Sequence, residues 1–514
     1  MELIKKQIHY NQEGKKIFDQ FVLDEDYNVP DAKEDVRQIV QNTGTVKVED
    51  IRTVENYIRI TGKFYFQILY LADSLEARPA VLEGKIPFEE MVYAENDENE
   101  NYYMENIRNE FTVTMVNSRK ISLKAMVEME IGKEKLEDEE TTTDVESTVP
   151  IYKKMKPVNL LKLNTTKKDT YRVKEEITLP GTKESVGVML VTHVSSRKLE
   201  IRPEMDALLI RGELLVFCMY LSEEEKTDWI EQSVPFEGRL ACDGVEEGMY
   251  YHVQHTLEDT LVDARMDEDG EMRILGIEGT INLRLNIYEE EQMELLADMY
   301  SLEQRCEFQT REAVYEELLM QNHSKCKIGE RLELPELKDN VLQICHSEGN
   351  IQIEHIERTE GGLQIEGILH LRADDSMPFG SWQGMVPFSY LMECAGVPEA
   401  VRYNMSYHVE QLLVTLAGSE AVEVKAVLAF DAFLRKPVPM QVITEAKLTE
   451  VPLGEMENRP GIVGYIVKAG DELWDLAKKY MTTVEGIKEI NTLETDTIKP
   501  GDKLLIFKEN MSIL

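Results

Sequence analysis

The chain has 514 residues, which is enough for about three or four domains, and its 42% hydrophobic and 30% charged residues are typical of globular proteins. The balance of 57 Lys and Arg against 97 Asp and Glu gives a net charge of −40, which argues against binding to nucleic acid or to an anionic membrane surface. No apolar run approaches the roughly 18 residues of a membrane span, and the opening MELIKKQIHY does not resemble a signal peptide. We therefore expect a protein that stays in the cytoplasm.

An eight-residue pattern, apolar-Pro-x-x-Lys-x-x-Val, occurs three times along the chain. It reads VPDAKEDV at 29–36, LPGTKESV at 179–186 and LPELKDNV at 334–341. The offsets of 150 and 155 residues are far too long for a solenoid unit, but they suit a whole domain. The pattern therefore suggests three copies of one module.

A strand-like stretch with an internal glycine follows each copy of the pattern. In YIRITGKFYFQILY, at 57–70, apolar and polar residues alternate with the period of a half-buried strand. The corresponding stretches are LLIRGELLVFCMY at 208–220 and LQIEGILHL at 363–371. Each glycine falls in the apolar register, where the missing side chain predicts a β-bulge or the close approach of another group. These glycines are Gly62, Gly212 and Gly367.

A Pro-Phe pair comes next in each copy, in IPFEE, VPFEG and VPFSY, and further strand-like stretches follow it. Landmarks that recur in one order predict a mainly β protein with three tandem repeats of sandwich or barrel-like form. We place these repeats at 1–160, 161–320 and 321–455. Trp229 and Trp382 each precede a Pro-Phe pair by a few residues, and we expect both to fill the same place in the repeat core.

The segments between the repeats are polar. GKEKLEDEETTTDVEST, at 132–148, is rich in charge and predicts a β-poor connector or a long loop. The residues at 289–320 fit either a helix or an extended lead strand.

Residues that could catalyse a reaction or bind a metal form no recognisable pattern. The six cysteines are scattered without a CxxC pair, so we expect reduced thiols, several of them in the core. His252 and His255 are three residues apart, but no carboxylate or thiol recurs beside them in the corresponding stretches of the repeats, which favours a structural role. P-loop, GxGxxG, HExxH and GxSxG motifs do not occur. We therefore expect no metal, no cofactor and no enzymatic activity.

The residues at 462–508 predict a small α+β domain of order β-α-α-β. YIVK and KLLIF are short strands, while ELWDLAKKY and TTVEGIKEIN have the apolar spacing of amphipathic helices. Asp471 is placed to cap the first helix, and Thr482-x-x-Glu485 matches a capping box for the second. Fewer than fifty residues give only a marginal core, so nearly every apolar position should be structural.

The pattern YxVxxGDxLWxxA…N…I.PGxxLxI resembles that of a LysM domain. The resemblance implies binding of N-acetylglucosamine-containing glycans in a shallow groove between two loops, which correspond to 469–473 and 495–500. One departure is Glu472, which stands where the family usually has Thr or Ser, and this weakens the case for glycan binding. The residues expected at the groove are Gly470, Asp471, Glu472, Leu473, Ile498 and Pro500.

Trp474 is the first candidate for contact with a protein partner. It lies beside Leu473, which already serves the small core, so we expect the indole to be partly exposed. A half-exposed Trp is a typical interface anchor, and core packing is the alternative role. Ile466, Lys468 and Ile487 are further candidates, although core or plain surface positions are commoner for such residues.

Three β repeats with Pro-Phe landmarks, followed by a LysM pattern, resemble the SPOCS-domain proteins of spore-forming Clostridia, in particular the SipL type of spore-coat morphogenetic protein. The resemblance implies a non-enzymatic adaptor in the mother-cell cytoplasm that localises to the forespore surface and the spore coat. It also implies that the LysM domain binds a coat-basement ATPase of the SpoIVA type, with other coat or forespore-membrane proteins as further partners. The alternative is a peptidoglycan-binding protein of the cell wall or cortex, which would need an export route.

Overall fold

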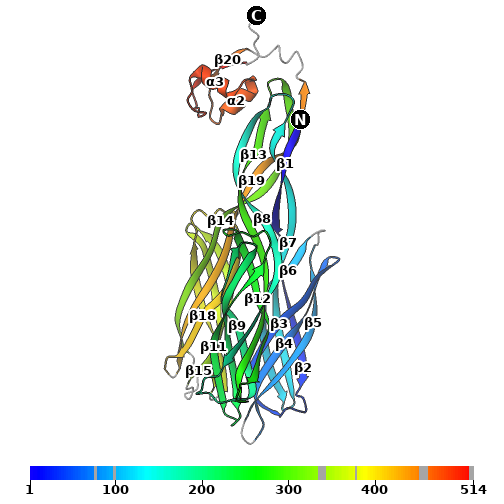
Figure 1. Cartoon of the computed structure of the whole chain (residues 1–514), viewed down its shortest axis with the longest axis vertical. Helices are drawn as coiled ribbons and strands as arrows, with labels where there is room; N and C mark the ends of the chain where they lie inside the picture. The colour runs from blue at the N-terminus through cyan, green and yellow to red at the C-terminus, as the bar shows by residue number, and fades with distance from the viewer. Residues whose placement is uncertain are drawn as a thin grey trace.

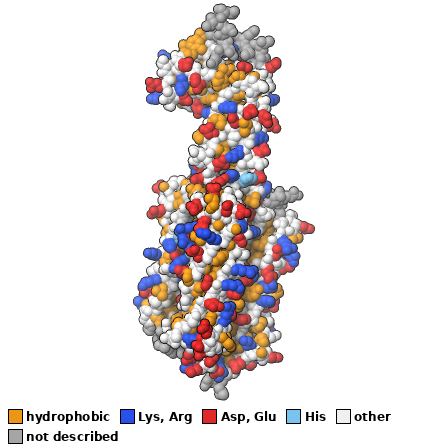
Figure 2. All heavy atoms as spheres, viewed as in Figure 1, with side chains coloured by type: hydrophobic (Ala, Val, Ile, Leu, Met, Phe, Trp, Pro, Cys, Tyr) orange, Lys and Arg blue, Asp and Glu red, His pale blue; other side chains and the backbone are white. Residues whose placement is uncertain are grey.

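The computed structural model describes residues 1–74, 78–95, 100–333, 343–376, 379–418, 420–450 and 461–508 of the chain. Three β-sandwiches form the body of the molecule, and a narrow stalk of strands leads from them to a small α+β unit at the far end (Figure 1). The space-filling view shows the stalk as a neck between these two parts (Figure 2). The expected fold class is thereby confirmed. Among the described residues, no helix combines the length and the apolar character that a membrane crossing requires.

Each repeat consists of six antiparallel strands in two three-stranded sheets. In repeat 1, a meander forms the sheet β3-β4-β5, and the lead strand joins the closing hairpin in the order β2-β7-β6. The apolar faces of these two sheets pack against each other. The strands are β2 (Ile17–Asn28), β3 (Val36–Val54), β4 (Tyr57–Ala72), β5 (Pro79–Tyr93), β6 (Asn101–Asn117) and β7 (Lys120–Glu146).

Repeats 2 and 3 reproduce this arrangement. The sheets are β9-β10-β11 and β8-β13-β12 in repeat 2, and β15-β16-β17 and β14-β19-β18 in repeat 3. The strands of repeat 2 are β8 (Tyr152–Thr178), β9 (Val186–Glu204), β10 (Ala207–Ser222), β11 (Thr227–Ala241), β12 (Tyr250–Met266) and β13 (Met272–Tyr300). Those of repeat 3 are β14 (Gln304–Glu333), β15 (Ile344–Thr359), β16 (Gly362–Ser376), β17 (Phe379–Glu393), β18 (Arg402–Leu416) and β19 (Ala421–Glu450).

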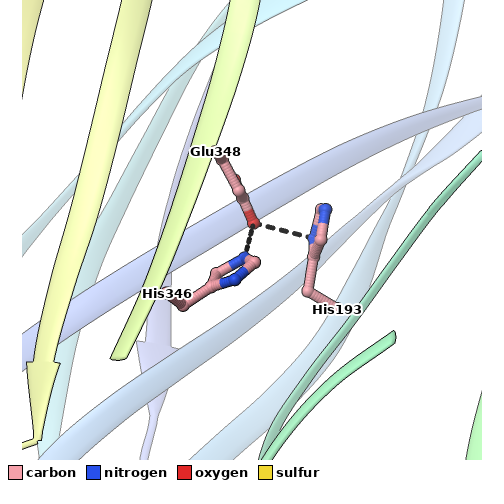
Figure 3. Close-up of side chains that lie close together, drawn as sticks. All are labelled: His193, His346 and Glu348. Atoms are coloured by element: carbon pink, nitrogen blue, oxygen red, sulfur yellow. Dashed lines mark ion pairs between the residues drawn. The ribbon is translucent and has the colours of Figure 1, made fainter. Parts of the chain in front are cut away.

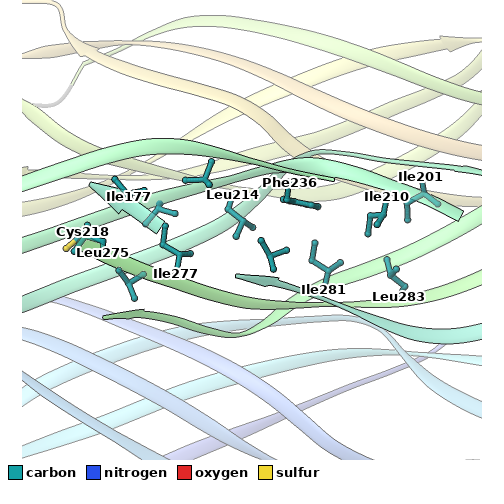
Figure 4. Close-up of a cluster of buried hydrophobic side chains, with 14 of the residues drawn as sticks. Ile177, Ile201, Ile210, Leu214, Cys218, Phe236, Leu275, Ile277, Ile281 and Leu283 are labelled. Atoms are coloured by element: carbon teal, nitrogen blue, oxygen red, sulfur yellow. The ribbon is translucent and has the colours of Figure 1, made fainter. Parts of the chain in front are cut away.

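The sandwich cores follow from the period of two in the strands. In repeat 2, Ile210 and Leu214 of β10 lie in one apolar layer with Leu275 and Ile281 of β13, and all four side chains are fully buried (Figure 4). Alternate residues of a strand point to the same side, so an alternating apolar pattern fills one face of a sheet and leaves the other polar. The strands predicted from this pattern are therefore the ones that build the core.

The eight-residue pattern forms the turn that carries the chain from one sheet of the sandwich to the other. In its first copy, the Lys33 N–H donates to the Pro30 carbonyl (2.8 Å), and the Arg119 guanidinium donates to the carbonyls of Lys33 (2.7 Å) and Pro30 (3.0 Å). The apolar ends of the pattern, Val29 and Val36, are buried in the core. The proline and the lysine thus shape the turn, while the flanking residues anchor it.

The second copy has the same geometry. The Lys183 N–H donates to the Pro180 carbonyl (2.9 Å), and Arg273 donates to the carbonyls of both residues (2.9 Å each). The third copy, with Pro335, Lys338 and Val341, lies outside the described residues.

The stalk consists of three two-stranded antiparallel ribbons, one from each repeat. The ribbons pair β1 (Glu2–Glu13) with the end of β7, the start of β8 with the end of β13, and the start of β14 with the end of β19. Their apolar side chains form one shared cluster, so the stalk joins the three repeats. This cluster includes Ile8, Val158, Leu160, Leu295, Ala313, Tyr315, Met440 and Val442.

The prediction of a β-poor connector at 132–148 is wrong, because β7 continues through this segment and pairs with β1. The buried acidic residues of the segment gain cationic partners from other repeats: Glu134 pairs with Arg284, and Glu139 with Arg311. Since these partners lie more than a hundred residues away, the local composition could not indicate them.

The residues at 289–320 form the end of β13 and the start of β14, which confirms the lead-strand alternative. The predicted repeat boundaries at 160 and 320 fall inside β8 and β14. Each of these lead strands runs from the stalk into its sandwich without a break.

The two repeat tryptophans do not occupy equivalent places, contrary to expectation. Trp229 pairs with Met219, which lies an odd number of residues after Gly212 on β10. Trp382 pairs with Ala373, which lies an even number of residues after Gly367 on β16. Because side chains alternate along a strand, the two indoles point to opposite faces. Trp382 packs on the core of repeat 3, and Trp229 packs on an apolar cluster shared between repeats.

The cysteines are free thiols, as expected, and four of the six are buried. His252 is buried on strand β12, and the ring of His255 lies 6.1 Å from that of His408. A strand directs residues three apart to opposite faces, so the two histidines of β12 cannot act as a helical metal-binding pair. The buried cysteines are Cys218, Cys242, Cys326 and Cys345.

Candidate functional site

The α+β unit at the end of the stalk has the predicted order β-α-α-β. Strand β20 (Ile462–Ile466) pairs antiparallel with β21 (Lys503–Phe507), and α2 (Leu473–Tyr480) and α3 (Val484–Asn491) connect them. Apolar residues of all four elements and of the stalk tip meet in one core. Its buried members are Tyr300, Val467, Leu473, Leu476, Ala477, Ile487, Leu504 and Ile506.

The caps of both helices differ from those predicted. Glu472, rather than Asp471, is the N-cap of α2, and its side chain makes no capping bond. The Asp471 carboxylate instead accepts hydrogen bonds from the Lys468 N–H (2.7 Å) and the Tyr465 hydroxyl (2.8 Å), which hold the pKa of Asp471 below its usual range. Asp471 therefore stabilises the loop ahead of the helix.

The second helix begins one residue later than the capping-box pattern suggests. Thr483 is the N-cap of α3, and its hydroxyl accepts a hydrogen bond from the Gly486 N–H at 2.9 Å. The predicted box of Thr482 and Glu485 is therefore wrong. The Thr482 carbonyl instead accepts a hydrogen bond from the hydroxyl of Tyr300 at the stalk tip (2.9 Å).

The two loops expected to form a glycan groove, at 469–473 and 495–500, are flanked by residues that pair with each other. The Gly501 N–H donates to the Val467 carbonyl (2.8 Å), and the Val467 N–H donates to the Asp502 carbonyl (2.9 Å). Among the expected groove residues, Leu473 is buried and Ile498 is partly buried in the core. Glu472 is exposed but forms an ion pair with Lys154 of β8, so the stalk neutralises the acidic side chain at the groove rim. Gly470, Pro500 and Glu472 are exposed, and Asp471 is partly buried.

Trp474 contacts the stalk. Its indole N–H donates to the Asp298 carboxylate (2.7 Å), and its ring meets Tyr300 edge to face, with 4.9 Å between the centroids. Lys478, one turn further along α2, donates to the other oxygen of Asp298 (2.5 Å). The half-buried indole expected from the sequence thus fixes the LysM-like unit on the end of β13, and its contact with a separate protein stays a prediction.

The other predicted partner contacts divide into exposed and buried residues. Ile466 is 62% exposed at the end of β20, and Lys468 is exposed just beyond it. Ile487 is fully buried in the core. Ile462 and Leu505, which the sequence analysis did not single out, are exposed on the same outer face of the two-stranded β20–β21 sheet as Ile466. Their exposure could have been inferred from the sequence, because side chains alternate between the two faces within each of these five-residue strands. We call Ile462, Ile466 and Leu505 the apolar strip.

Comparison with known proteins assigns both parts of the molecule. The family described as SipL, SPOCS domain, matches residues 35–131, 185–265 and 340–417, and the LysM domain family matches residues 465–507. These SPOCS matches lie within the sandwiches, over β3 to β7 in repeat 1, β9 to β12 in repeat 2 and β15 to β18 in repeat 3, and they leave out the lead strands and the stalk.

Two similar curated proteins share the LysM region alone. The probable endopeptidase p60 of Listeria monocytogenes is 50% identical over 44 residues, and that of Listeria grayi is 49% identical over 41 residues. These alignments cover 9% and 8% of this chain, and the same shares of the two relatives. No solved structure matches the chain. The chain belongs to the SipL family of SPOCS-domain proteins and carries a LysM domain after its third repeat.

Proposed function

We propose that the protein is a non-enzymatic adaptor of spore-coat assembly in the mother-cell cytoplasm, whose LysM domain binds a coat-basement ATPase of the SpoIVA type at the forespore surface. SPOCS and LysM domains are non-catalytic families, and together they fit either a coat adaptor or a cell-wall-binding protein. The observation that favours the adaptor is the apolar strip, whose three side chains are exposed on the outer face of the β20–β21 sheet.

The strip suits a protein surface better than a glycan. Neighbouring exposed apolar side chains mark a contact surface, because association removes them from water. The groove loops at 469–473 and 495–500 are separate from the strip, which belongs to the strands. Lys468 adds a positive charge close to the strip in a chain whose net charge is −40. The occupant that fits is a protein surface with an apolar centre and an acidic neighbour.

The overall shape supports the same function. The stalk separates the LysM domain from the three sandwiches, so partners can bind at both ends of the molecule without competing for space (Figure 1). Partners of the sandwiches would be other coat or forespore-membrane proteins. Many weak contacts along a polymerised ATPase would give high avidity without one strong interface.

The test is binding of the full-length protein to the immobilised ATPase. We expect Ile466→Glu to weaken binding at least about tenfold, because it replaces one of the three apolar side chains of the strip with a charge. The matched control is Met205→Glu, which changes an equally exposed apolar residue on repeat 2. Equal affinities for both variants, each with an unchanged unfolding temperature, would contradict the proposal.

The second candidate function is binding to peptidoglycan, which the LysM match itself supports. It predicts that the protein sediments with purified sacculi, and that Glu472→Thr, which restores a hydroxyl at the groove rim, increases the sedimented fraction. Sedimentation with sacculi together with indifference to the ATPase would replace the adaptor proposal with this one.

A further inference from the structure

His193, His346 and Glu348 come together at the contact between repeats 2 and 3 (Figure 3). His193 lies on β9 of repeat 2, and the other two lie on β15 of repeat 3. The Glu348 Oε1 atom is 2.7 Å from His193 Nδ1 and 3.5 Å from His346 Nε2. Two imidazole nitrogens and one carboxylate oxygen therefore converge from two separate repeats on one point.

His346 is held as metal-binding histidines are held. Its side chain is only 1% exposed, and its ring stacks on Phe217 of β10 at 4.2 Å between centroids. Its Nδ1 atom lies 2.7 Å from the Glu231 carboxylate, which fixes the orientation of the ring. In the part of the chain that the structure describes, the buried Nε2 atom has no hydrogen-bond partner, and it faces Glu348. A buried polar atom without a hydrogen bond is costly, so a missing occupant would complete this site.

Two carboxylates lie next to the His346 ring, Glu231 at Nδ1 and Glu348 on the side of Nε2, so negative charge is held close to this point.

We propose that His193, His346 and Glu348 form a zinc site that clips repeat 2 to repeat 3. Two imidazole nitrogens and a carboxylate oxygen are a set of donors that Zn²⁺ commonly uses, with water as the fourth ligand. Glu231 completes the arrangement, since a zinc-bound histidine usually donates its other N–H to a carboxylate.

Small movements suffice to admit the ion. Ligand atoms at about 2.0–2.1 Å from Zn²⁺ lie roughly 3.4 Å apart in a tetrahedron. The separation between His346 and Glu348 is already 3.5 Å, and His193 must move away from Glu348 by less than 1 Å from its present 2.7 Å. The two imidazole nitrogens, which lie within 4.8 Å of each other, must approach by at most about 1.4 Å. Arg372 donates to the same oxygen of Glu348 at 3.0 Å. A carboxylate has two oxygens, so Glu348 can bind the metal through one and Arg372 through the other.

The ion would stabilise a junction at which all three repeats meet. Gln41 of repeat 1 donates to Asp374 of repeat 3 (3.1 Å), and Asp374 lies beside Arg372. An adjacent apolar cluster contains Leu69 of repeat 1 and Phe217 of repeat 2. A zinc ion there would restrain the three sandwiches relative to one another at this junction. The stalk, which also joins the three repeats, restrains them at a different place in the molecule.

The test uses the untagged full-length protein, stripped of metal with a chelator and titrated with Zn²⁺ against a chromophoric competitor. We expect one equivalent of tightly bound zinc, and with Co²⁺ the visible absorption of a four-coordinate N/O site. His193→Ala should abolish tight binding, and because this residue is partly exposed the variant should fold normally. Glu231→Gln, which leaves all three ligands in place, should weaken binding about 10- to 100-fold.

The matched control is His323→Ala, which removes an exposed histidine that also pairs with a carboxylate, Asp431. It should bind zinc as the unaltered protein does. Two outcomes would overturn the proposal. One is that the unaltered protein binds no zinc, in which case a proton shared by His346 and the carboxylates fills the site. The other is that His193→Ala binds zinc as tightly as the unaltered protein.

Discussion

Phe88 lies directly across from Gly62 in the β4–β5 ladder, and its ring occupies the space that a side chain on the glycine would need. A Cβ atom at position 62 would lie 2.6 Å from Phe88 Cζ and 2.3 Å from the Lys47 carbonyl oxygen. An aromatic ring laid over a glycine in this way restores the packing that the glycine gives up.

The same pair recurs in the other repeats, as Gly212 with Phe236 and Gly367 with Phe388. The ladder beside each of these glycines also shifts register, as expected for a β-bulge. The internal glycine and the Pro-Phe landmark of the sequence are therefore two halves of one cross-strand pair.

Gly62→Ala tests this pair. We expect it to destabilise repeat 1 by about 1–3 kcal/mol, because the added methyl group must displace the Phe88 ring or the Lys47 carbonyl. Calorimetric unfolding of the full-length protein measures the effect. Gly181→Ala is the matched control, because nothing lies within 4 Å of its Cβ position. Equal unfolding profiles for the two variants would contradict the assigned role of the ring.

Arg435 joins strands of repeats 1 and 3 where the stalk meets the sandwiches. Its side chain is buried, and its guanidinium donates to Glu13 of β1 (3.0 Å), Glu316 of β14 (3.1 Å) and Asn404 of β18 (2.6 Å). We expect Arg435→Ala to lower the free energy of unfolding by about 3–5 kcal/mol, since the part-buried Glu13 loses its cationic partner and the buried Glu316 keeps only Arg402. Denaturant unfolding followed by circular dichroism measures this change.

The adjacent residue supplies the control for Arg435. Lys436 pairs with Glu317 at the surface (3.3 Å), so Lys436→Ala should cost at most about 1 kcal/mol. A loss of similar size in both variants would mean that the buried network does not hold the stalk base together.

Asp298 fixes the LysM domain by accepting hydrogen bonds from both Trp474 and Lys478. We expect Asp298→Ala to loosen this contact, which should increase hydrogen exchange along α2 and shift the fluorescence of Trp474 toward that of a more exposed indole. Asp496→Ala removes the exposed partner of Lys488 within the LysM domain, and it should leave both observables unchanged. Unaltered exchange in Asp298→Ala would show that the apolar packing on Tyr300 suffices to hold the domain.

Acidification should weaken the contact between repeats 2 and 3. Burial lowers the pKa of both His252 and His255 to about 4, and both line a cavity of about 480 Å³ between these repeats. In the unfolded chain their pKa is about 6.5, so the unfolded state binds more protons between pH 6.5 and pH 4. The stability that depends on these two histidines is therefore fully present above pH 6.5 and falls toward pH 4, by at most about 1.4 kcal/mol per pH unit for each histidine.

The measurement is the unfolding temperature between pH 7 and pH 5 at constant ionic strength. His252→Gln should reduce the slope, because one group that titrates differently in the two states is gone. His355→Gln, which changes an exposed histidine, should keep the slope of the unaltered protein. Identical slopes for all three proteins would assign the acid sensitivity to other groups.

The repeats, their strands and the LysM unit could be predicted from the sequence, because these features rest on short-range rules. Alternating apolar residues define the strands, and the Pro-x-x-Lys pattern forms the turn held by Arg119 in repeat 1 and by Arg273 in repeat 2. The amphipathic spacing of α2 and α3 identified the small C-terminal core in the same way.

The places where the repeats meet, and the elements that they share, depend on long-range packing and could not be predicted from the sequence. The stalk, the contact of Trp474 with Asp298, and the convergence of His193 with Glu348 each join residues more than 100 positions apart. The segment at 132–148 shows the reason most clearly. Its carboxylates look solvated in the sequence, yet Glu134 and Glu139 are buried, because the cations that neutralise them come from other repeats. Charge pairing across such distances depends on the packing of whole domains, and no local pattern records it.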